Sequence, residues 1–232
     1  MFWKTKERWI REKRYRQSGF RLIAGVDEAG RGALAGPVVA AAVILPEEFD
    51  HPDLDDSKVL TPEKRVELYE IIIKEAVSYA VASASIEEID EHGILRATLM
   101  AMTRALESLE PPPQLALIDG QFTTPWRGLQ KAIIDGDALC LSVAAASILA
   151  KVTRDRFMEE ADREFPEYGF FQHKGYATRR HLEALREYGP CPLHRLSFKP
   201  VAEAKERQRT WAPGGKAGGP LLTPQRLSNH PS

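Results

Sequence analysis

The chain has 232 residues, of which 43% are hydrophobic and 28% charged, a composition typical of a globular protein with one substantial core in one or two domains. Its longest uncharged stretch, 32–46, is shorter than the roughly 20 apolar residues that a membrane-spanning helix needs. The basic N-terminus lacks the apolar segment of a signal peptide, and two cysteines are too few for a disulfide framework. We therefore expect a cytoplasmic protein.

The formal net charge of −1 hides an uneven distribution. Residues 1–24 carry eight Lys or Arg against two Glu, and residues 199–232 carry six basic against two acidic residues, so the middle of the chain is acidic. Basic ends on an acidic body suit a nucleic-acid partner. Basic ends that only aid solubility fit the pattern equally well.

The first residues of the chain indicate a basic arm followed by a hairpin. Residues 1–20 mix basic and aromatic side chains and predict either a helix docked on the body or a mobile arm. The apolar segment 22–26 predicts a strand, and the acidic pair Asp27-Glu28 follows it directly. A glycine-containing turn then leads into a second apolar run, 38–45, which predicts the other strand of the hairpin.

Helix and strand patterns alternate over the rest of the chain, which indicates an α/β sheet. Helix starts are marked by Thr61-Pro62, with Thr as N-cap, and by the capping-box spacing that begins at Ser85. The predicted elements are helices from 61, from 86 through 106, over 138–165 and over 179–188, and strands over 79–86, 115–118 and 131–134. Residues 202–232, with four Gly, four Pro and few aliphatic residues, are expected to be disordered.

Four acidic residues each lie where an apolar, strand-like run stops: Asp27, Glu28, Asp119 and Asp137. Ligands bind at the carboxyl ends of strands in open α/β sheets. Acids gathered there would repel one another, and divalent cations would compensate that repulsion. Carboxylate oxygens suit Mg²⁺ or Mn²⁺, and two such ions would activate water and stabilise the leaving oxygen of a phosphoryl displacement.

The acidic pair has a geometric requirement. Consecutive strand residues point to opposite faces, so Asp27 and Glu28 share one metal site only if the strand bends or a backbone carbonyl takes part. The alternative interpretation of this stretch is an ordinary hairpin that carries two solvated acids.

Several motifs resemble one family when they are taken together and in order. They are Gly25-Val26-Asp27-Glu28-Ala29-Gly30-Arg31-Gly32, Asp56-Ser57-Lys58, Ile118-Asp119-Gly120, Gly136-Asp137, Ser142 to Asp155, Tyr168-Gly169-Phe170, His173-Lys174-Gly175-Tyr176, and Gly189-Pro190 to Phe198. This set resembles bacterial ribonuclease HII over about residues 20–200. No single motif would be specific, but the combination is.

The resemblance implies an α/β fold with a ribonuclease H-like mixed sheet flanked by helices and a small helical C-terminal extension. The expected organisation is an N-terminal arm over 1–20, a catalytic domain over 21–201 and a tail over 202–232. The implied activity is two-metal hydrolysis, with Mn²⁺ or Mg²⁺, of the RNA strand of RNA–DNA hybrids. It includes cutting 5′ of ribonucleotides embedded in duplex DNA, leaving 3′-hydroxyl and 5′-phosphate ends, by a chain expected to act as a monomer.

The resemblance also implies a role for individual residues. The metal-binding and catalytic acids would be Asp27, Glu28, Asp119 and Asp137. The substrate-binding residues would be Gly30, Arg31 and Gly32, which read the 2′-hydroxyl largely through backbone groups, Tyr176, which stacks on a sugar, and Ser57, Lys58 and Lys151, the two lysines at phosphates. One departure is Ala33, where the family usually has Pro; it removes no functional group.

Other classes of function predict different features. A non-catalytic nucleic-acid-binding protein would use the basic ends but has no need of four acids at strand ends. Another ribonuclease H-like nuclease, such as a junction resolvase, differs only in lacking the Gly30–Gly32 loop and Tyr176. Cys191 and His194, with His173 and His181, invite a zinc interpretation, but the pattern lacks a second close ligand pair. The glycines over 25–36 do not have the spacing of a dinucleotide loop.

Overall fold

The computed structural model describes residues 12–49, 51, 54 and 60–211, which form a mixed sheet with helices on both faces. The strand order is β3-β2-β1-β4-β5. The strands are β1 (Ile23–Ala29), β2 (Val38–Ile44), β3 (Ser78–Ala84), β4 (Leu115–Asp119) and β5 (Gln130–Ile133). β1, β2 and β3 pair antiparallel, whereas β4 runs parallel to both β1 and β5. The expected mixed sheet flanked by helices is confirmed.

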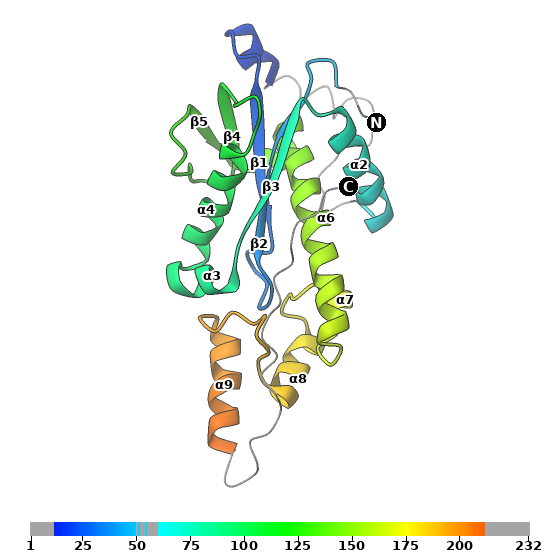
Figure 1. Ribbon diagram of the computed structural model, residues 1–232, viewed down its shortest axis with the longest axis vertical. Coiled ribbons are helices and arrows are strands. Elements are labelled where there is room, and N and C mark those ends of the chain that lie inside the picture. The colour runs from blue at the N-terminus through cyan, green and yellow to red at the C-terminus, as the bar shows by residue number, and fades with distance from the viewer. Residues whose placement is uncertain (1–11, 50, 52–53, 55–59, 212–232) are drawn as a thin grey trace.

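Helices α2 (Pro62–Glu75) and α6 (Leu141–Glu164) cover one face of the sheet, and α3 (Ile86–His92) and α4 (Ile94–Glu107) cover the other (Figure 1). β2 contributes Val43 to the core on the α6 side and Ala42 to the core on the α4 side. A strand buried on both faces needs apolar residues at every position, which explains the unbroken apolar run of β2.

Two predicted helices are each divided in the structure. Gly93, with φ of +79°, separates α3 from α4, because this left-handed backbone ends one helix and starts the next. Cys140 is extended and separates the short α5 (Gly136–Leu139) from α6. The predicted helix starts at Thr61 and Ser85 are confirmed, the first by a hydrogen bond from the Lys64 amide and the second by a full capping box.

The first turn of α6 lies directly on β1. A Cβ atom at Gly25 would come within 2.1 Å of the Ser142 carbonyl carbon, so this strand position accepts only glycine. α6 is thereby held at the closest possible distance from the strand that carries Asp27 and Glu28.

The described part of the N-terminal arm is a short helix over 12–17 docked at the same place. Glu12 is fully buried, and its Oε1 accepts hydrogen bonds from the Ser142 amide at 2.8 Å and the Ser142 hydroxyl at 2.9 Å. Burial raises the pKa of Glu12. The N-cap residue of α6, Cys140, provides no side-chain cap, so Glu12 satisfies this helix terminus from outside.

We expect Glu12→Ala to lower the free energy of unfolding by about 1–2 kcal/mol, because it removes the group that caps α6. The melting temperature of a chain of this size should fall by about 2–4 °C for each kcal/mol. Glu12→Gln is the matched control, since its amide oxygen still accepts from Ser142. Thermal denaturation with equal midpoints for both variants and the wild type would exclude a capping role.

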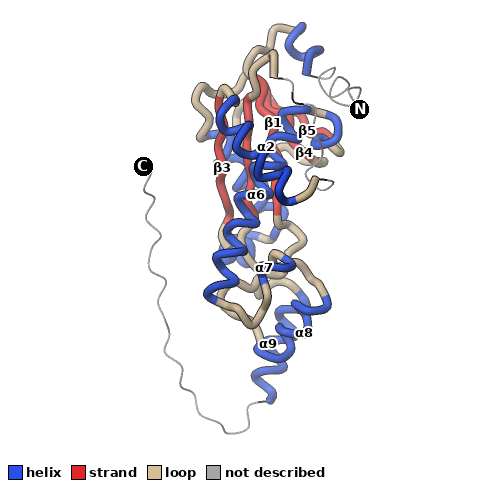
Figure 2. Tube along the Cα trace, turned by 90° about the vertical axis from the view of Figure 1, so that its right-hand side faces the viewer, coloured by secondary structure: helices blue, strands red, loops and turns tan. Residues whose placement is uncertain are grey.

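The C-terminal module, residues 165–211, lies beyond one end of the sheet and contains three helices (Figures 1 and 2). They are α7 (Phe170–His173), α8 (Arg179–Tyr188) and α9 (Lys199–Trp211). In the described residues, no helix has the length and apolar character needed to cross a membrane.

The expectation of disorder from residue 202 onward is wrong over 202–211, because α9 continues to Trp211. Val201 and Ala204 are buried against Leu34 and Leu185, so two apolar residues three positions apart suffice to dock this helix. The remainder of the predicted tail, 212–232, lies outside the described residues.

A chain that ends at residue 201 should therefore be less stable than one that ends at 211. The shorter chain loses buried Ala204 and the hydrogen bond from Gln208 Nε2 to the Tyr188 carbonyl, for which we expect a loss of about 1–2 kcal/mol. Chemical denaturation of the two truncated chains measures the difference. Identical unfolding midpoints would mean that α9 does not support the module.

Candidate active site

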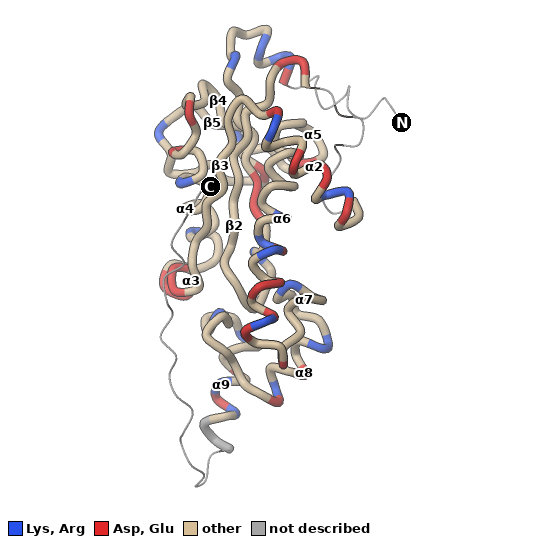
Figure 3. Tube along the Cα trace, turned by 45° about the vertical axis from the view of Figure 1, so that its right-hand side comes forward, with Lys and Arg blue, Asp and Glu red and all other residues tan. Residues whose placement is uncertain are grey.

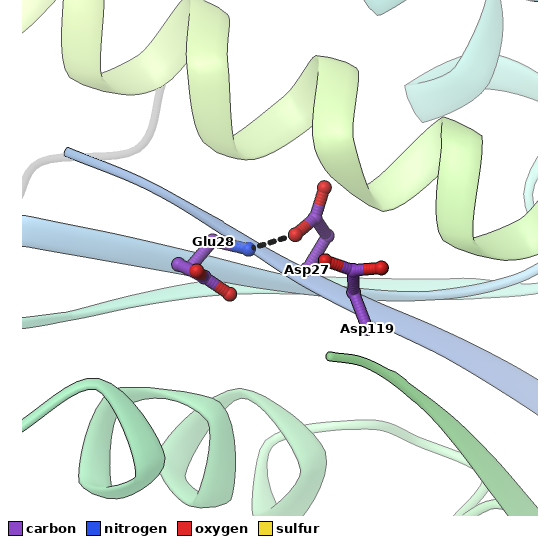
Figure 4. Close-up of side chains that lie close together, drawn as sticks. All are labelled: Asp27, Glu28 and Asp119. Carbon is purple, nitrogen blue, oxygen red and sulfur yellow. Dashed lines mark hydrogen bonds between the residues drawn. The ribbon is translucent and has the colours of Figure 1, made fainter. Parts of the chain in front are cut away.

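The pairing of β1 with β4 brings two of the predicted acids side by side. Val26 is aligned with Ile118 in the parallel pair, so the next residues, Asp27 and Asp119, are neighbours on adjacent strands. Asp27 is 5% exposed, and Figure 4 shows its side chain pointing toward α6 with the carboxylate of Asp119 beside it.

Glu28 completes a cluster of three carboxylates. Asp27, Glu28 and Asp119 each offer one carboxylate oxygen, and these oxygens lie within 4.8 Å of one another. Glu28 lies where β1 still pairs with β2, opposite Ala40, but past the end of the pairing with β4 at Val26, and its side chain reaches the cluster. The Glu28 amide donates to Asp27 Oδ1 at 2.7 Å (Figure 4). The carboxylates of these two consecutive residues therefore come close enough together to share one ion with Asp119.

Asp137, the fourth predicted acid, lies near the cluster but is not one of the three. It is buried in the first turn of α5, and its Oδ1 accepts a hydrogen bond from the Ala138 amide at 2.9 Å. α5 is tied to the cluster by the Gly136 amide, which donates to Asp119 Oδ1 at 2.7 Å. The predicted acids are thus a group of three with Asp137 at its edge.

Repulsion among these acids disfavours the charged form of Asp27. Burial raises the pKa of Asp27 well above its ordinary value, and the neighbouring charges of Glu28 and Asp119 raise it further; Asp137 adds a smaller effect. Without a compensating cation, the ionised cluster therefore destabilises the folded state at pH values above that raised pKa.

The residues that follow β1, 30–37, form what we call the recognition loop, and two buried arginines hold it. Arg154 donates to the carbonyls of Pro37 at 3.1 Å, Ala35 at 2.9 Å and Lys174 at 2.9 Å. Arg195 donates to the carbonyls of Gly36 at 2.9 Å and Arg31 at 3.1 Å. Basic and acidic positions are interspersed from α6 into the C-terminal module (Figure 3).

The two glycines of the predicted reading motif differ in what surrounds them. Gly30 has φ of +96°, and a Cβ there would meet Arg154 Nε at 2.0 Å, so the fold itself requires glycine. Gly32 has no atom within 4 Å of the place of a Cβ and no positive φ, so the fold does not require glycine there. The side chain of Arg31, between them, pairs with Glu28 at 3.2 Å.

Tyr176 is joined to the recognition loop, far from it in sequence. It forms an isolated β-bridge with Ala33, and the Leu34 amide donates to the Gly175 carbonyl at 2.8 Å. Its ring lies 5.3 Å from the Arg154 guanidinium carbon and 5.8 Å from Lys151 Nζ. Lys151 also forms an ion pair with Asp155 at 2.6 Å.

Two predicted substrate contacts, Ser57 and Lys58, lie outside the described residues. The sequence analysis gave no role to Arg154 and Arg195, the two buried arginines that hold the recognition loop. The signal available for Arg154 was its place in a helix rich in small residues, where a charged side chain is buried only if it finds partners. For Arg195 no comparable signal exists.

The zinc interpretation is not supported in the part of the chain that the structure describes. The group of His, Cys, Asp and Glu side chains close enough to hold a metal ion there is Asp27, Glu28 and Asp119. His173, His181 and His194 stack and hydrogen-bond with one another instead of surrounding a point.

Comparison with known proteins agrees with this geometry. A family model described as Ribonuclease HII matches residues 24–201. The chain belongs to the ribonuclease HII family. A protein named Ribonuclease HII from Desulfitobacterium hafniense is 55% identical over 192 residues, which cover 83% of this chain and 74% of that protein. A second protein named Ribonuclease HII, from Geobacillus kaustophilus, is 52% identical over 202 residues, which cover 85% of this chain and 77% of that protein.

Solved structures support the same family. The crystal structure of ribonuclease H2 from Pyrococcus horikoshii is 31% identical and superposes with a TM-score of 0.72, covering 81% of this chain and 98% of that one. The resemblance inferred from the sequence is confirmed. Ribonuclease HII proteins are metal-dependent endoribonucleases, and membership of the family assigns this chain to that enzyme class and supports action on the RNA of RNA–DNA hybrids.

We expect Asp119→Asn to fold normally, because the amide oxygen still accepts from the Gly136 amide, and to lose at least about two orders of magnitude of cleavage. Removing one charge beside Asp27 should also raise the melting temperature measured in EDTA. Because the folded-state pKa of Asp27 is raised, this gain should be largest above that pKa and should shrink as the pH falls through it.

The measurements are cleavage of a labelled hybrid and thermal denaturation in EDTA between pH 5 and 8. Wild-type cleavage by Asp119→Asn would remove Asp119 from the active site. A gain in melting temperature that does not change with pH would contradict the repulsion assigned to the cluster.

Proposed function

We propose that this ribonuclease HII cuts on the 5′ side of ribonucleotides embedded in duplex DNA, as well as within RNA–DNA hybrids, and leaves 3′-hydroxyl and 5′-phosphate ends. We further propose that it does so as a cytoplasmic monomer with two divalent metal ions, Mn²⁺ or Mg²⁺. The observation that carries the proposal is Gly32, an exposed glycine that the fold does not need, in the recognition loop beside the acidic cluster.

The acidic cluster fits a divalent cation. Its donors are carboxylate oxygens, the ligands that Mg²⁺ and Mn²⁺ prefer, and three of them lie within 4.8 Å of one another. A cation would also remove the repulsion that raises the pKa of Asp27. Asp27, Glu28 and Asp119 would hold the metal, with Asp137 at the edge of the site. When bound, divalent ions would activate a water molecule and neutralise the charge that develops on the leaving oxygen.

The proposed reaction adds water across one P–O3′ bond. The water oxygen bonds to phosphorus and releases a proton, the P–O3′ bond breaks, and the departing O3′ takes up a proton to become the 3′-hydroxyl. The phosphate stays on the 5′ oxygen of the ribonucleotide. In this scheme the recognition loop selects the bond, because it meets the sugar on the 3′ side of the scissile phosphate.

Backbone groups around Gly32 are suited to reading the 2′-hydroxyl, the group that distinguishes RNA from DNA. An absent side chain at an exposed, unstrained position lets a substrate approach the backbone closely. Tyr176, joined to the loop through Ala33, would pack on the neighbouring deoxyribose, and Lys151, close to its ring, would contact a phosphate. Ser57 and Lys58 are proposed as further substrate contacts on the strength of the family resemblance alone.

The two glycines give a matched pair of variants. Gly32→Ala should keep the wild-type melting temperature and lose at least about tenfold in cleavage, because the new methyl group blocks the approach of the sugar but touches nothing in the protein. Gly30→Ala should lose stability as well, because its Cβ collides with Arg154. Cleavage and thermal denaturation of both variants are measured together. Full activity of Gly32→Ala would show that its backbone does not meet the substrate.

The substrate preference is tested with a duplex that carries one ribonucleotide and with a continuous RNA–DNA hybrid. Tyr176→Ala should reduce cutting at the single ribonucleotide about tenfold more than cutting of the hybrid, because only the former has a deoxyribose beside the scissile bond. Arg31→Ala should have a milder effect on both, since the reading groups are in the backbone. Cutting of an all-DNA duplex at an equal rate would contradict the proposal.

A further inference from the structure

Three histidines of the C-terminal module are buried in contact with one another, and one of them bonds to the backbone of Tyr176. His181 and His194 are 0% and 1% exposed, and the ring of His173 stacks on that of His181 with centroids 4.4 Å apart. The proposed function uses none of them. Each ring nitrogen of the three has a hydrogen-bond partner, which is enough to assign its protonation.

The assignment starts at Tyr176. Its carbonyl oxygen is only an acceptor, so His181 Nδ1, at 2.9 Å, must carry a hydrogen. A neutral imidazole then has an acceptor at Nε2, so His194 Nε2, at 3.0 Å, must be the donor. His194 Nδ1 is left as an acceptor, which agrees with the Cys191 amide that donates to it at 3.0 Å.

Both rings are neutral in this arrangement, and the surroundings favour that state. Burial, together with a smaller effect of the adjacent imidazoles, lowers the pKa of His181 to about 4 and that of His194 to about 3. A proton added to His181 Nε2 would set two N–H groups against each other at the 3.0 Å contact with His194. A proton added to His194 Nδ1 would do the same at the 3.0 Å contact with the Cys191 amide.

We propose that Cys191, His194 and His181 form an imidazole relay that positions Tyr176, and that His181 and His194 are positioning residues for substrate selection. The carbonyl of Tyr176 accepts from His181 Nδ1 at 2.9 Å, beside a bond from the Thr178 amide at 2.8 Å, and the His173 carbonyl accepts from the Tyr176 amide at 2.9 Å. The backbone of Tyr176 is thus held on both sides at the point where it meets Ala33 of the recognition loop.

The inference rests on the proposed role of Tyr176 in substrate selection, so the test separates failure of that role from failure of the relay. It compares kcat/KM at a single embedded ribonucleotide with kcat/KM on a continuous hybrid and takes the ratio for each variant. His181→Phe keeps a ring but loses both nitrogens, and the ratio should fall about tenfold, as for Tyr176→Ala. The double variant of these two should fall no further, because both changes act on one contact.

Two variants control for loss of stability. His181→Asn places an amide N–H near the position of Nδ1 and should restore the ratio even if the protein is less stable. Tyr168→Phe removes a different buried hydrogen bond of the same module, from the Tyr168 hydroxyl to the Gly189 carbonyl at 2.7 Å, and should leave the ratio near the wild-type value.

Nitrogen NMR of the wild-type histidines gives a readout that does not depend on cleavage. We expect the proton on Nδ1 of His181 and on Nε2 of His194 at neutral pH; the opposite tautomer at either ring would overturn the relay. A normal ratio for His181→Phe beside a reduced ratio for Tyr176→Ala would also overturn it. If Tyr176→Ala leaves the ratio unchanged, the proposed role of Tyr176 fails, and the tautomers still decide whether the relay exists.

Discussion

The structure depends on the close packing of α6, β1 and β4 around a group of mutually repelling carboxylates. Gly25 lets the first turn of α6 lie directly on β1, and the parallel pairing of β1 with β4 puts Asp27 beside Asp119. Packing and backbone hydrogen bonds on these elements hold the acids at a distance that their charges oppose. Folding energy spread over the whole sheet thereby maintains a local arrangement that a cation would stabilise.

A second part of the structure connects the sheet to the C-terminal module. The recognition loop has few side chains of its own to hold it, and Arg154 and Arg195 bind its carbonyls instead. Both guanidinium groups are buried and bind carbonyl oxygens. Burial and the charge of nearby Arg154 lower the pKa of Arg195 to about 9. A buried guanidinium is stable only where its hydrogen-bond partners are held in place, so these two arginines require a rigid recognition loop. Rigidity is what a loop needs if it presents backbone groups to a substrate.

Local patterns in the sequence predicted much of the fold. The helix starts at Thr61 and Ser85 follow from capping chemistry, and the mixed sheet from the family resemblance. Asp119 does end β4, but Asp27 and Glu28 lie inside β1, which continues to Ala29, and Asp137 lies in α5. The breaks at Gly93 and Cys140 were missed because each interrupts a pattern that remains helical on both sides. The docking of α9 was missed because composition suggested a tail, whereas buried Val201 and Ala204 and the hydrogen bond from Gln208 to the Tyr188 carbonyl hold this helix.

The site was also predicted only in part, because sequence patterns show local features and not contacts between distant residues. Acids at strand ends are visible in a sequence, and three of the four predicted ones meet in space. Their exact distances depend on register, which no local pattern gives. Asp137 lies beside the three on α5, and its role as a metal ligand stays a prediction. The cap that Glu12 provides, the buried arginines and the histidine contacts join residues far apart in the chain, and only the folded structure reveals them.

The central claim is that the repulsion among Asp27, Glu28 and Asp119 is compensated by a divalent metal ion. Crystals of the protein soaked in Mn²⁺ and measured at a wavelength where manganese scatters anomalously test it directly. The account predicts an anomalous peak among the three carboxylates in the wild type and its loss in Asp27→Asn. A peak elsewhere, with none at this cluster, would contradict it.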